Sequence, residues 1–102
     1  EDLDLGILLL PELKTSAPTF EKKILGNLSE KEKADYMNLL KAYEKHNGSI
    51  TKCSAELFIH KNTLQYRLNS LHEKTGFNPR DLNDYVILKL AFLIYEISHK
   101  MV

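Results

Sequence analysis

Three side-chain amides stand at regular spacing in the middle of this 102-residue sequence. Asn62, Gln65 and Asn69 lie at i, i+3 and i+7, which places them along one side of a helix. Asn and Gln side chains can pair bidentately with adenine, so this spacing is typical of base reading in a DNA groove. Ordinary surface helices also have polar outer faces, so the amides need a DNA-binding framework around them to carry that meaning.

Basic side chains accompany the amides. We predict that Lys61 and Arg67 neutralise DNA phosphates, with Lys52 as a weaker backbone contact from a preceding helix. Residues 49–75 carry four basic and two acidic side chains, whereas the whole chain balances 14 Lys and Arg against 14 Asp and Glu. Because the local positive excess is small, we expect one copy to bind double-stranded DNA weakly. A homodimer on paired half-sites is then needed for useful affinity.

Imidazole, hydroxyl and phenol groups complete the predicted surface. His60 and Thr63 fall in the first turn of the same predicted helix, where backbone amides and side chains commonly meet DNA phosphates. Tyr66 is placed either to hydrogen-bond a phosphate or to pack against the preceding helix. The predicted DNA-binding residues are Lys52, His60, Lys61, Asn62, Thr63, Gln65, Tyr66, Arg67 and Asn69.

Catalytic and metal-binding patterns do not occur in the sequence. The four histidines, His46, His60, His72 and His99, are not spaced to hold a metal together with a carboxylate. Cys53 and His60 fall on different predicted helices, so no local signature supports a Cys–His nucleophile pair. A single cysteine excludes a disulfide framework and fits a reducing compartment. We therefore expect neither an enzyme nor a bound cofactor, and we interpret Cys53 as a small buried residue.

The elements that must position these side chains are predicted to be helices. Ser29 and Glu32 match a capping box, and the helix that they open ends at Asn47-Gly48. Short and long helices are then predicted over residues 49–57 and 60–74, joined by a tight connection, and a last helix over residues 83–98. The fold class is therefore all-α: a compact domain of about five helices.

The predicted helices over residues 49–57 and 60–74 form a helix-turn-helix. Their close crossing requires a small residue in the first helix, which Ser54 or Ala55 supplies. The apolar residues spaced to fix that crossing are Cys53, Leu57, Ile59, Leu64 and Leu68. The outer face of the second helix is then free to enter a major groove about 12 Å wide.

The two ends of the chain are less regular. We divide it into an N-terminal connecting segment, 1–28, and a DNA-binding domain, 29–102, with its helix-turn-helix core at 49–75. The stretch from Leu3 to Leu13 fits either a helix or a strand. A short helix capped by Ser16 or Thr19 is predicted to end in a left-handed turn at residues 26–27.

The last helix is unusually apolar, because only Lys89 and Glu96 interrupt residues 85–97. Such a helix is either central to the core, or has one face at a homodimer seam or against the part of the parent protein outside this chain. Its 13 residues span ~20 Å, which is too short for a membrane core of ~30 Å. We expect a cytoplasmic protein without membrane contact. Because the sequence begins at Glu1, we also expect it to be preceded by the remainder of a longer protein.

The segment 57–68 reads Leu-Phe-Ile-His-Lys-Asn-Thr-Leu-Gln-Tyr-Arg-Leu and resembles the C-terminal helix-turn-helix of the PucR purine-catabolism regulators and of the related sugar-diacid regulators. Leu25-Gly26-x-Leu28 and Leu88-x-Leu90-Ala91 are similar to flanking steps of that family. The helix-turn-helix also resembles the Fis type. The resemblance implies a bacterial transcription regulator whose N-terminal sensor region, outside this chain, recognises a small molecule.

Carried over by position, the resemblance implies that His60 to Thr63 begin the recognition helix and that Tyr66 and Arg67 follow on it. The family usually has Arg where Lys61 stands, and Lys offers a point charge instead of a bidentate fork. The sequence thus predicts a sequence-specific DNA-binding domain with its recognition helix in the major groove. The alternative is a helical dimerisation or protein-interaction module with a degenerate helix-turn-helix.

Overall fold

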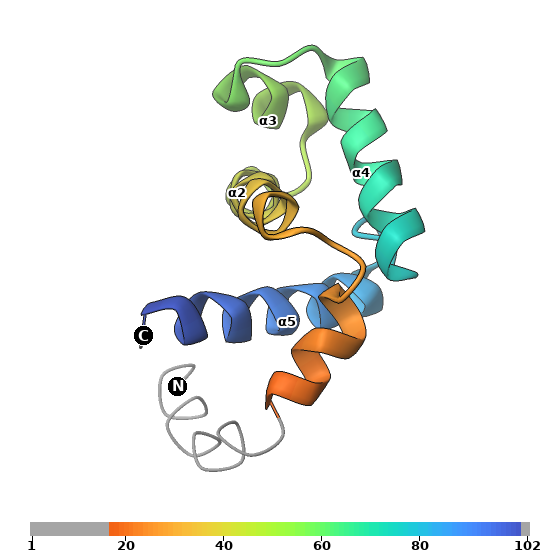
Figure 1. Ribbon diagram of the computed structural model, residues 1–102. Coiled ribbons are helices and arrows are strands. Elements are labelled where there is room, and N and C mark those ends of the chain that lie inside the picture. Colours follow the sequence, from red (N-terminus) through yellow and green to blue (C-terminus); the bar gives the residue numbers. More distant parts are fainter. Residues whose placement is uncertain (1–16, 101–102) are drawn as a thin grey trace.

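The computed structural model describes residues 17–100, and this part of the chain is helical without strands. The all-α prediction is therefore confirmed. None of the helices in this range combines the length and the apolar character that crossing a membrane requires. A first helical segment covers residues 17–25. The helices that follow are α2 (Glu30–Lys45), α3 (Ile50–Leu57), α4 (Lys61–Thr75) and α5 (Leu82–Lys100) (Figure 1).

Helix α2 begins and ends where local chemistry requires. The Ser29 hydroxyl accepts a hydrogen bond from the Glu32 amide at 3.1 Å, and the Ser29 amide donates to the Glu32 carboxylate at 2.9 Å. This is the predicted capping box, which satisfies two amides that a helix start leaves free. After Lys45 the chain turns through Asn47 and Gly48, whose φ values of 53° and 79° lie in the left-handed region.

The prediction for the end of the first helical segment is wrong. Neither Gly26 nor Asn27 has a positive φ, so no left-handed turn forms there. Gly26 is needed for close approach, because a Cβ atom at this position would lie 2.3 Å from the carbonyl oxygen of Lys22. Thr19 lies inside the helical segment and does not cap it. Ser16 and the ambiguous stretch 3–13 lie outside the described residues.

Leucines from four helical segments meet in one core. Leu25, Leu64, Leu68, Leu71 and Leu88 are each fully buried, as are the Cys53 thiol and the Ala91 methyl. Helix α2 lies between α3 and α5, and it contributes residues Leu39 and Leu40 to the same cluster (Figure 1). The core therefore holds α3 and α5 on opposite sides of α2, and α4 runs from beside α3 to the start of α5 (Figure 1).

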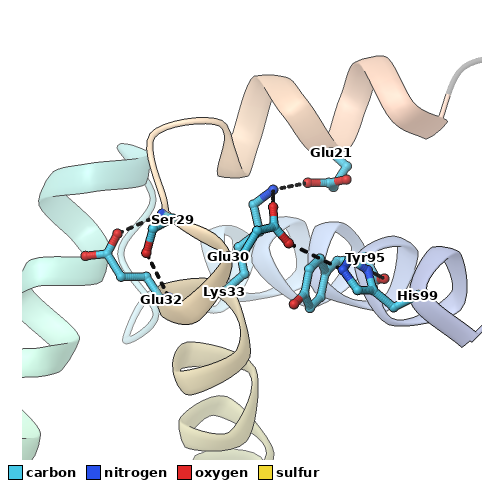
Figure 2. A network of polar contacts seen from close by, with 7 residues as sticks. All are labelled: Glu21, Ser29, Glu30, Glu32, Lys33, Tyr95 and His99. Carbon is cyan, nitrogen blue, oxygen red and sulfur yellow. Dashed lines mark hydrogen bonds and ion pairs between the residues drawn. The ribbon is translucent and has the colours of Figure 1, made fainter.

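A polar network fastens the first helical segment to α2 and α5 (Figure 2). The Lys33 ammonium lies 3.0 Å from Glu21 and 3.2 Å from Glu30, and 5.7 Å from the centre of the Tyr95 ring. The Lys33 ammonium also holds the pKa of the Glu30 carboxyl below its usual value. His99 on α5 contacts Glu30 at 3.3 Å. These contacts fix the end of the domain that lies away from the helix-turn-helix.

Helix α5 has two unlike sides. Its core side buries Leu88, Ala91, Phe92, Ile94 and Tyr95, as expected of a central core helix. Its other side leaves four large apolar residues exposed to solvent. Their exposed fractions are 76% for Leu82, 58% for Val86, 40% for Leu90 and 45% for Leu93. The prediction of a core helix is confirmed for one side only.

Candidate nucleic-acid interface

Helix α3 is positioned by a cap and by one small residue. The Ser49 hydroxyl accepts a hydrogen bond from the Lys52 amide at 3.2 Å and so caps the helix. Ser54 is buried where the chain must pack closely, and its hydroxyl donates to the Thr51 carbonyl at 3.1 Å. Ala55 is exposed. Of the two candidates, Ser54 and Ala55, the small residue at the helix crossing is therefore Ser54.

The turn between α3 and α4 passes through a left-handed phenylalanine. Phe58 has φ 56° and ψ 42°, and its amide donates to the Ala55 carbonyl at 3.2 Å. The Ile59 amide donates to the Ser54 carbonyl at 3.1 Å, which satisfies a second carbonyl at the end of α3. Ile59 packs against the core, whereas the Phe58 side chain is 94% exposed. Left-handed backbone is unusual for an aromatic residue.

His60 is the cap of α4, a role that its position in the sequence did not reveal. Its Nδ1 accepts a hydrogen bond from the Asn62 amide at 3.0 Å. A ring nitrogen that accepts carries no proton, so the neutral ring places its proton on Nε2. His60 is exposed, which leaves Nε2–H available as a donor next to the start of α4.

Helix α4 separates an apolar inner face from a polar outer face. Leu64 and Leu68 are fully buried, as predicted, and so is Leu71. Asn62, Tyr66 and Asn69 lie on the opposite side at i, i+4 and i+7, and all three are exposed. Tyr66 is 72% exposed, so it points outward and does not pack against α3.

Gln65 stands at the edge of that outer face and already has a partner. Its Oε1 accepts a hydrogen bond from the Arg80 guanidinium at 2.6 Å. Arg80 lies in the connection before α5, where its amide donates to the Asn78 side chain at 3.0 Å. Arg80 could not be predicted from local spacing, because 15 residues separate it from Gln65 in the sequence. The structure therefore adds a fourth cation to the surface beside α4.

Arg67 lies on the other edge of α4, where it faces α2. It lines two neighbouring hollows, and Asp35 and Leu39 of α2 line both with it. Thr63 precedes Arg67 by one turn of the helix and is half-buried. Asn62 and Asn69 thus share one face, whereas Gln65 and Arg67 flank it on opposite sides.

Three cations of this surface have no acidic partner in the described part of the chain. Within residues 17–100, Lys52, Lys61 and Arg67 make no ion pair with an acidic side chain. Lys74, at the far end of α4, is bound to Glu32 of α2, and its ammonium lowers the pKa of the Glu32 carboxyl. Lys52, Lys61 and Arg67 thus lie unpaired on α3 and on the first half of α4, and the unpaired Arg80 lies beside them. The other cations of residues 17–100 without an ion pair, Lys22 and Lys23, belong to the first helical segment.

Glu56, the acidic residue of α3, has its partners within the domain. Glu56 lies 2.7 Å from the His46 ring and 3.2 Å from the Lys45 ammonium. The hydrogen bond from His46, and then that from Lys45, lower the pKa of Glu56. These contacts hold the carboxylate toward the end of α2, so its charge is partly cancelled there.

Residues 17–100 hold no cluster of three or more His, Cys, Asp or Glu side chains that could bind a metal. Cys53 is fully buried, and burial raises the pKa of its thiol, which disfavours the nucleophilic thiolate. His60 is exposed and engaged with Asn62. The geometry of the site is that of a binding surface built from polar and cationic side chains.

This arrangement of α3, a tight turn and α4, with a buried leucine stripe and an exposed polar face, defines a helix-turn-helix domain. The family described as "PucR C-terminal helix-turn-helix domain" matches residues 36–94, which is more than half of the chain. The chain belongs to this family, and the predicted resemblance is confirmed.

Similar full-length proteins include transcription regulators. The chain is 40% identical over 57 residues to the carbohydrate diacid regulator of Escherichia coli (strain K12), covering 56% of this chain and 15% of that protein. It is 39% identical over 77 residues to the proline-responsive transcriptional activator PutR of Bacillus subtilis (strain 168), covering 72% of this chain and 18% of that protein. No solved structure matches the chain. The chain therefore corresponds to a small part of these relatives.

Proposed function

We propose that this chain is the sequence-specific DNA-binding domain of a bacterial PucR-like transcription regulator, with α4 as its recognition helix. The observation that carries the proposal is the set of unpaired cations on α3 and α4. They flank an exposed polar face that has no internal role. A surface of this kind suits a polyanion whose phosphates take the place of acidic partners. The major groove, about 12 Å wide, admits one helix such as α4.

Each side chain then has a role set by its place on α4. Asn62 and Asn69 read base edges from the outer face, and Gln65 reads an adjacent base from the edge that Arg80 occupies. Lys61, Thr63 and Arg67 position the helix on phosphates. The remaining phosphate donors are Lys52 at the start of α3, the Nε2–H of His60, the Tyr66 hydroxyl and the Arg80 guanidinium.

The rest of the proposed regulator lies outside this chain. The relatives are several times longer, and one of them is named as responsive to proline. We propose that the parent protein likewise senses a small molecule through an N-terminal region and acts in the cytoplasm. Two copies bind paired half-sites, because one helix-turn-helix with few phosphate contacts gives weak affinity.

A salt titration tests the DNA-binding proposal. Fluorescence anisotropy with random duplex DNA should show affinity that falls steeply between about 50 and about 200 mM salt. The Lys61→Ala/Arg67→Ala variant should bind more weakly and show a salt slope lower by about 2, one for each lost phosphate contact. Lys22→Ala/Lys23→Ala removes the same charge from exposed positions in the first helical segment. This control should bind as the wild type does.

Equal losses in both variants would indicate attraction to net charge without a defined surface. Circular dichroism would confirm that the helices persist in each variant. The alternative function, a helical interaction module with a degenerate helix-turn-helix, is favoured by the exposed apolar side of α5. Sedimentation with and without duplex DNA separates the two functions. The alternative requires self-association or a protein partner, with no binding to DNA even at low salt.

A further inference from the structure

The exposed side of α5 carries the spacing of a coiled-coil seam. Val86, Leu90, Leu93 and Ile97 follow one another at intervals of four, three and four residues. This is the a/d repeat with which one helix packs against another. Val86, Leu90 and Leu93 are exposed, Ile97 is half-buried, and the core lies on the opposite side of the helix. Contiguous apolar exposure of this kind marks an interaction site.

We propose that α5 is a homodimer contact in which the α5 helices of two copies pack antiparallel through these four residues, here called the α5 seam. The proposal rests on the homodimer in the proposed function and names its contact surface. In the antiparallel register Leu90 lies opposite Leu93 of the second copy, and Val86 lies opposite Ile97.

Charge complementarity identifies the occupant as a second copy. Lys89 and Glu96 are seven residues apart, so they flank the α5 seam on the same side, at the positions that pair across antiparallel coiled coils. The two-fold axis brings Lys89 of each copy beside Glu96 of the other, twice per dimer. In a parallel pair Lys89 would instead face position 94 of the other copy, where Ile94 is apolar and buried in the monomer, so Lys89 would gain no acidic partner. The pattern of charge therefore favours antiparallel self-pairing over parallel pairing.

Lys89 and Glu96 beside the α5 seam are each held by an ion pair to α2. Lys89 forms an ion pair with Glu44 of α2, and Glu96 lies 2.8 Å from Lys41 of α2. All four side chains line the groove between α2 and α5. Pairing across the two-fold axis extends these ion pairs and leaves no charge buried alone. A seam of four residues is small, so the isolated domain should self-associate weakly and reversibly.

Sedimentation equilibrium of the 102-residue chain without DNA tests the proposal. The wild type should show concentration-dependent dimerisation. Leu90→Glu should weaken it by about tenfold or more, because it places a charge in the centre of the contact. Leu82→Glu is the matched control, since Leu82 is more exposed than Leu90 but lies outside the a/d repeat and beyond the overlap of the two helices. A wild type that stays monomeric at about 1 mM, a weak limit for specific association, overturns the proposal.

Charge reversal tests the antiparallel geometry. Lys89→Glu and Glu96→Lys should each weaken dimerisation, because each places like charges across the α5 seam. The double variant should restore dimerisation, because opposite charges again face each other across the α5 seam. Within each monomer, however, the new charges at positions 89 and 96 repel Glu44 and Lys41 of α2. Thermal melting of all three variants measures that internal cost separately. If the double variant dimerises no better than the singles, the antiparallel register is wrong.

Cross-linking gives an independent measurement of the register. A mixture of Leu90→Cys and Leu93→Cys chains should oxidise to the mixed disulfide, because these positions face each other only in the antiparallel pair. The native Cys53 is fully buried and does not compete. Predominant 90–90 disulfides would overturn the antiparallel seam. Because these experiments contain no DNA, their failure leaves the salt titration of the helix-turn-helix as a separate test.

Discussion

Helices α4 and α5 are both leucine-rich, yet they present opposite chemistry to solvent. Each buries one apolar side in the shared core, through Leu68 in α4 and Leu88 in α5. The outer side of α4 then carries amides beside unpaired cations, whereas the outer side of α5 carries leucines beside cations that are paired. The inner faces therefore explain the fold, and the outer faces differ in the partners that we propose for them.

Ion pairing follows the same division. Lys41 and Lys89 at the α5 groove have carboxylate partners, whereas Lys61 and Arg67 on α4 have none within residues 17–100. Paired charges on a surface cost little and add little stability. Unpaired charges keep their attraction for an external polyanion. The lysines near α5 thus already have partners inside the domain, which the proposed dimer contact would extend, whereas Lys61 and Arg67 are left for an external anion.

The largest expected effect is on the free energy of unfolding, when a buried leucine and an exposed leucine are each replaced by alanine. Leu68→Ala should lower the free energy of unfolding by about 2–5 kcal/mol, because it removes buried methyl groups and leaves a cavity in a closed core. Leu93→Ala, on the outer side of α5, should change it by less than about 0.5 kcal/mol. Urea unfolding at low protein concentration measures both. Similar losses would mean that the outer side of α5 is covered within the monomer.

The next test concerns the amides of α4. Asn62→Ala should cost about 1–3 kcal/mol of binding to the preferred site and relax specificity at one base pair. Gln65→Ala should relax specificity at a neighbouring position, with a smaller loss because Arg80 already engages its oxygen. Selection of bound sequences from random duplex DNA measures both effects.

Asn83→Ala on α5 is the matched control for these substitutions, since it removes the same side chain from an exposed position outside the surface. It should leave the preferred site unchanged. An unchanged preference in the Asn62 and Gln65 variants as well would show that the base-reading assignment is wrong, even where overall affinity persists.

Most of the fold could be predicted because its signals are local. The capping box of Ser29 and Glu32, the stop at Gly48, and the leucine spacing of α4 each lie within a few residues. Gly26 shows the limit of that approach. Its role depends on its distance to the Lys22 carbonyl, one helical turn earlier. In a sequence, a glycine needed for such close approach cannot be distinguished from a glycine needed for a left-handed turn.

The site was harder to predict because its details depend on contacts between elements. Arg80 reaches Gln65 from a loop after α4, and Arg67 lies toward Asp35 of α2. The pairing of Lys74 with Glu32 joins residues 42 apart. Spacing along one helix predicts which residues share a face, but it does not reveal which of them the rest of the fold has already engaged.

A smaller effect is expected from acid at the α5 groove. The hydrogen bond from Lys89, and then that from Tyr85, lower the pKa of the Glu44 carboxyl. A carboxyl whose pKa is lower in the folded state stabilises the fold above its unfolded pKa of about 4.3, and this contribution is lost as pH falls through the folded pKa. Because Glu44 is exposed and screened by solvent, its contribution should stay below about 1 kcal/mol.

Urea unfolding between about pH 6 and about pH 3 measures this contribution, with Glu44→Gln as the variant that lacks it. The wild type should lose more stability than the variant over that range. Equal slopes would show that the Lys89–Glu44 pair is too mobile to affect folding. The amide variant keeps the shape of the side chain, so the comparison isolates the charge.

The smallest expected effect concerns the turn that leads into α4. A left-handed backbone costs an L-residue about 1–2 kcal/mol, and glycine avoids this cost while losing about 0.5–1 kcal/mol of chain entropy. Phe58→Gly should therefore raise the free energy of unfolding by up to about 1 kcal/mol. Phe58→Ala keeps the backbone cost and removes only the ring, which is 94% exposed, so it should leave stability nearly unchanged. Thermal unfolding of the two variants separates the contribution of the backbone conformation from that of the ring. A loss of stability in both variants would show that the ring packs against the domain in solution.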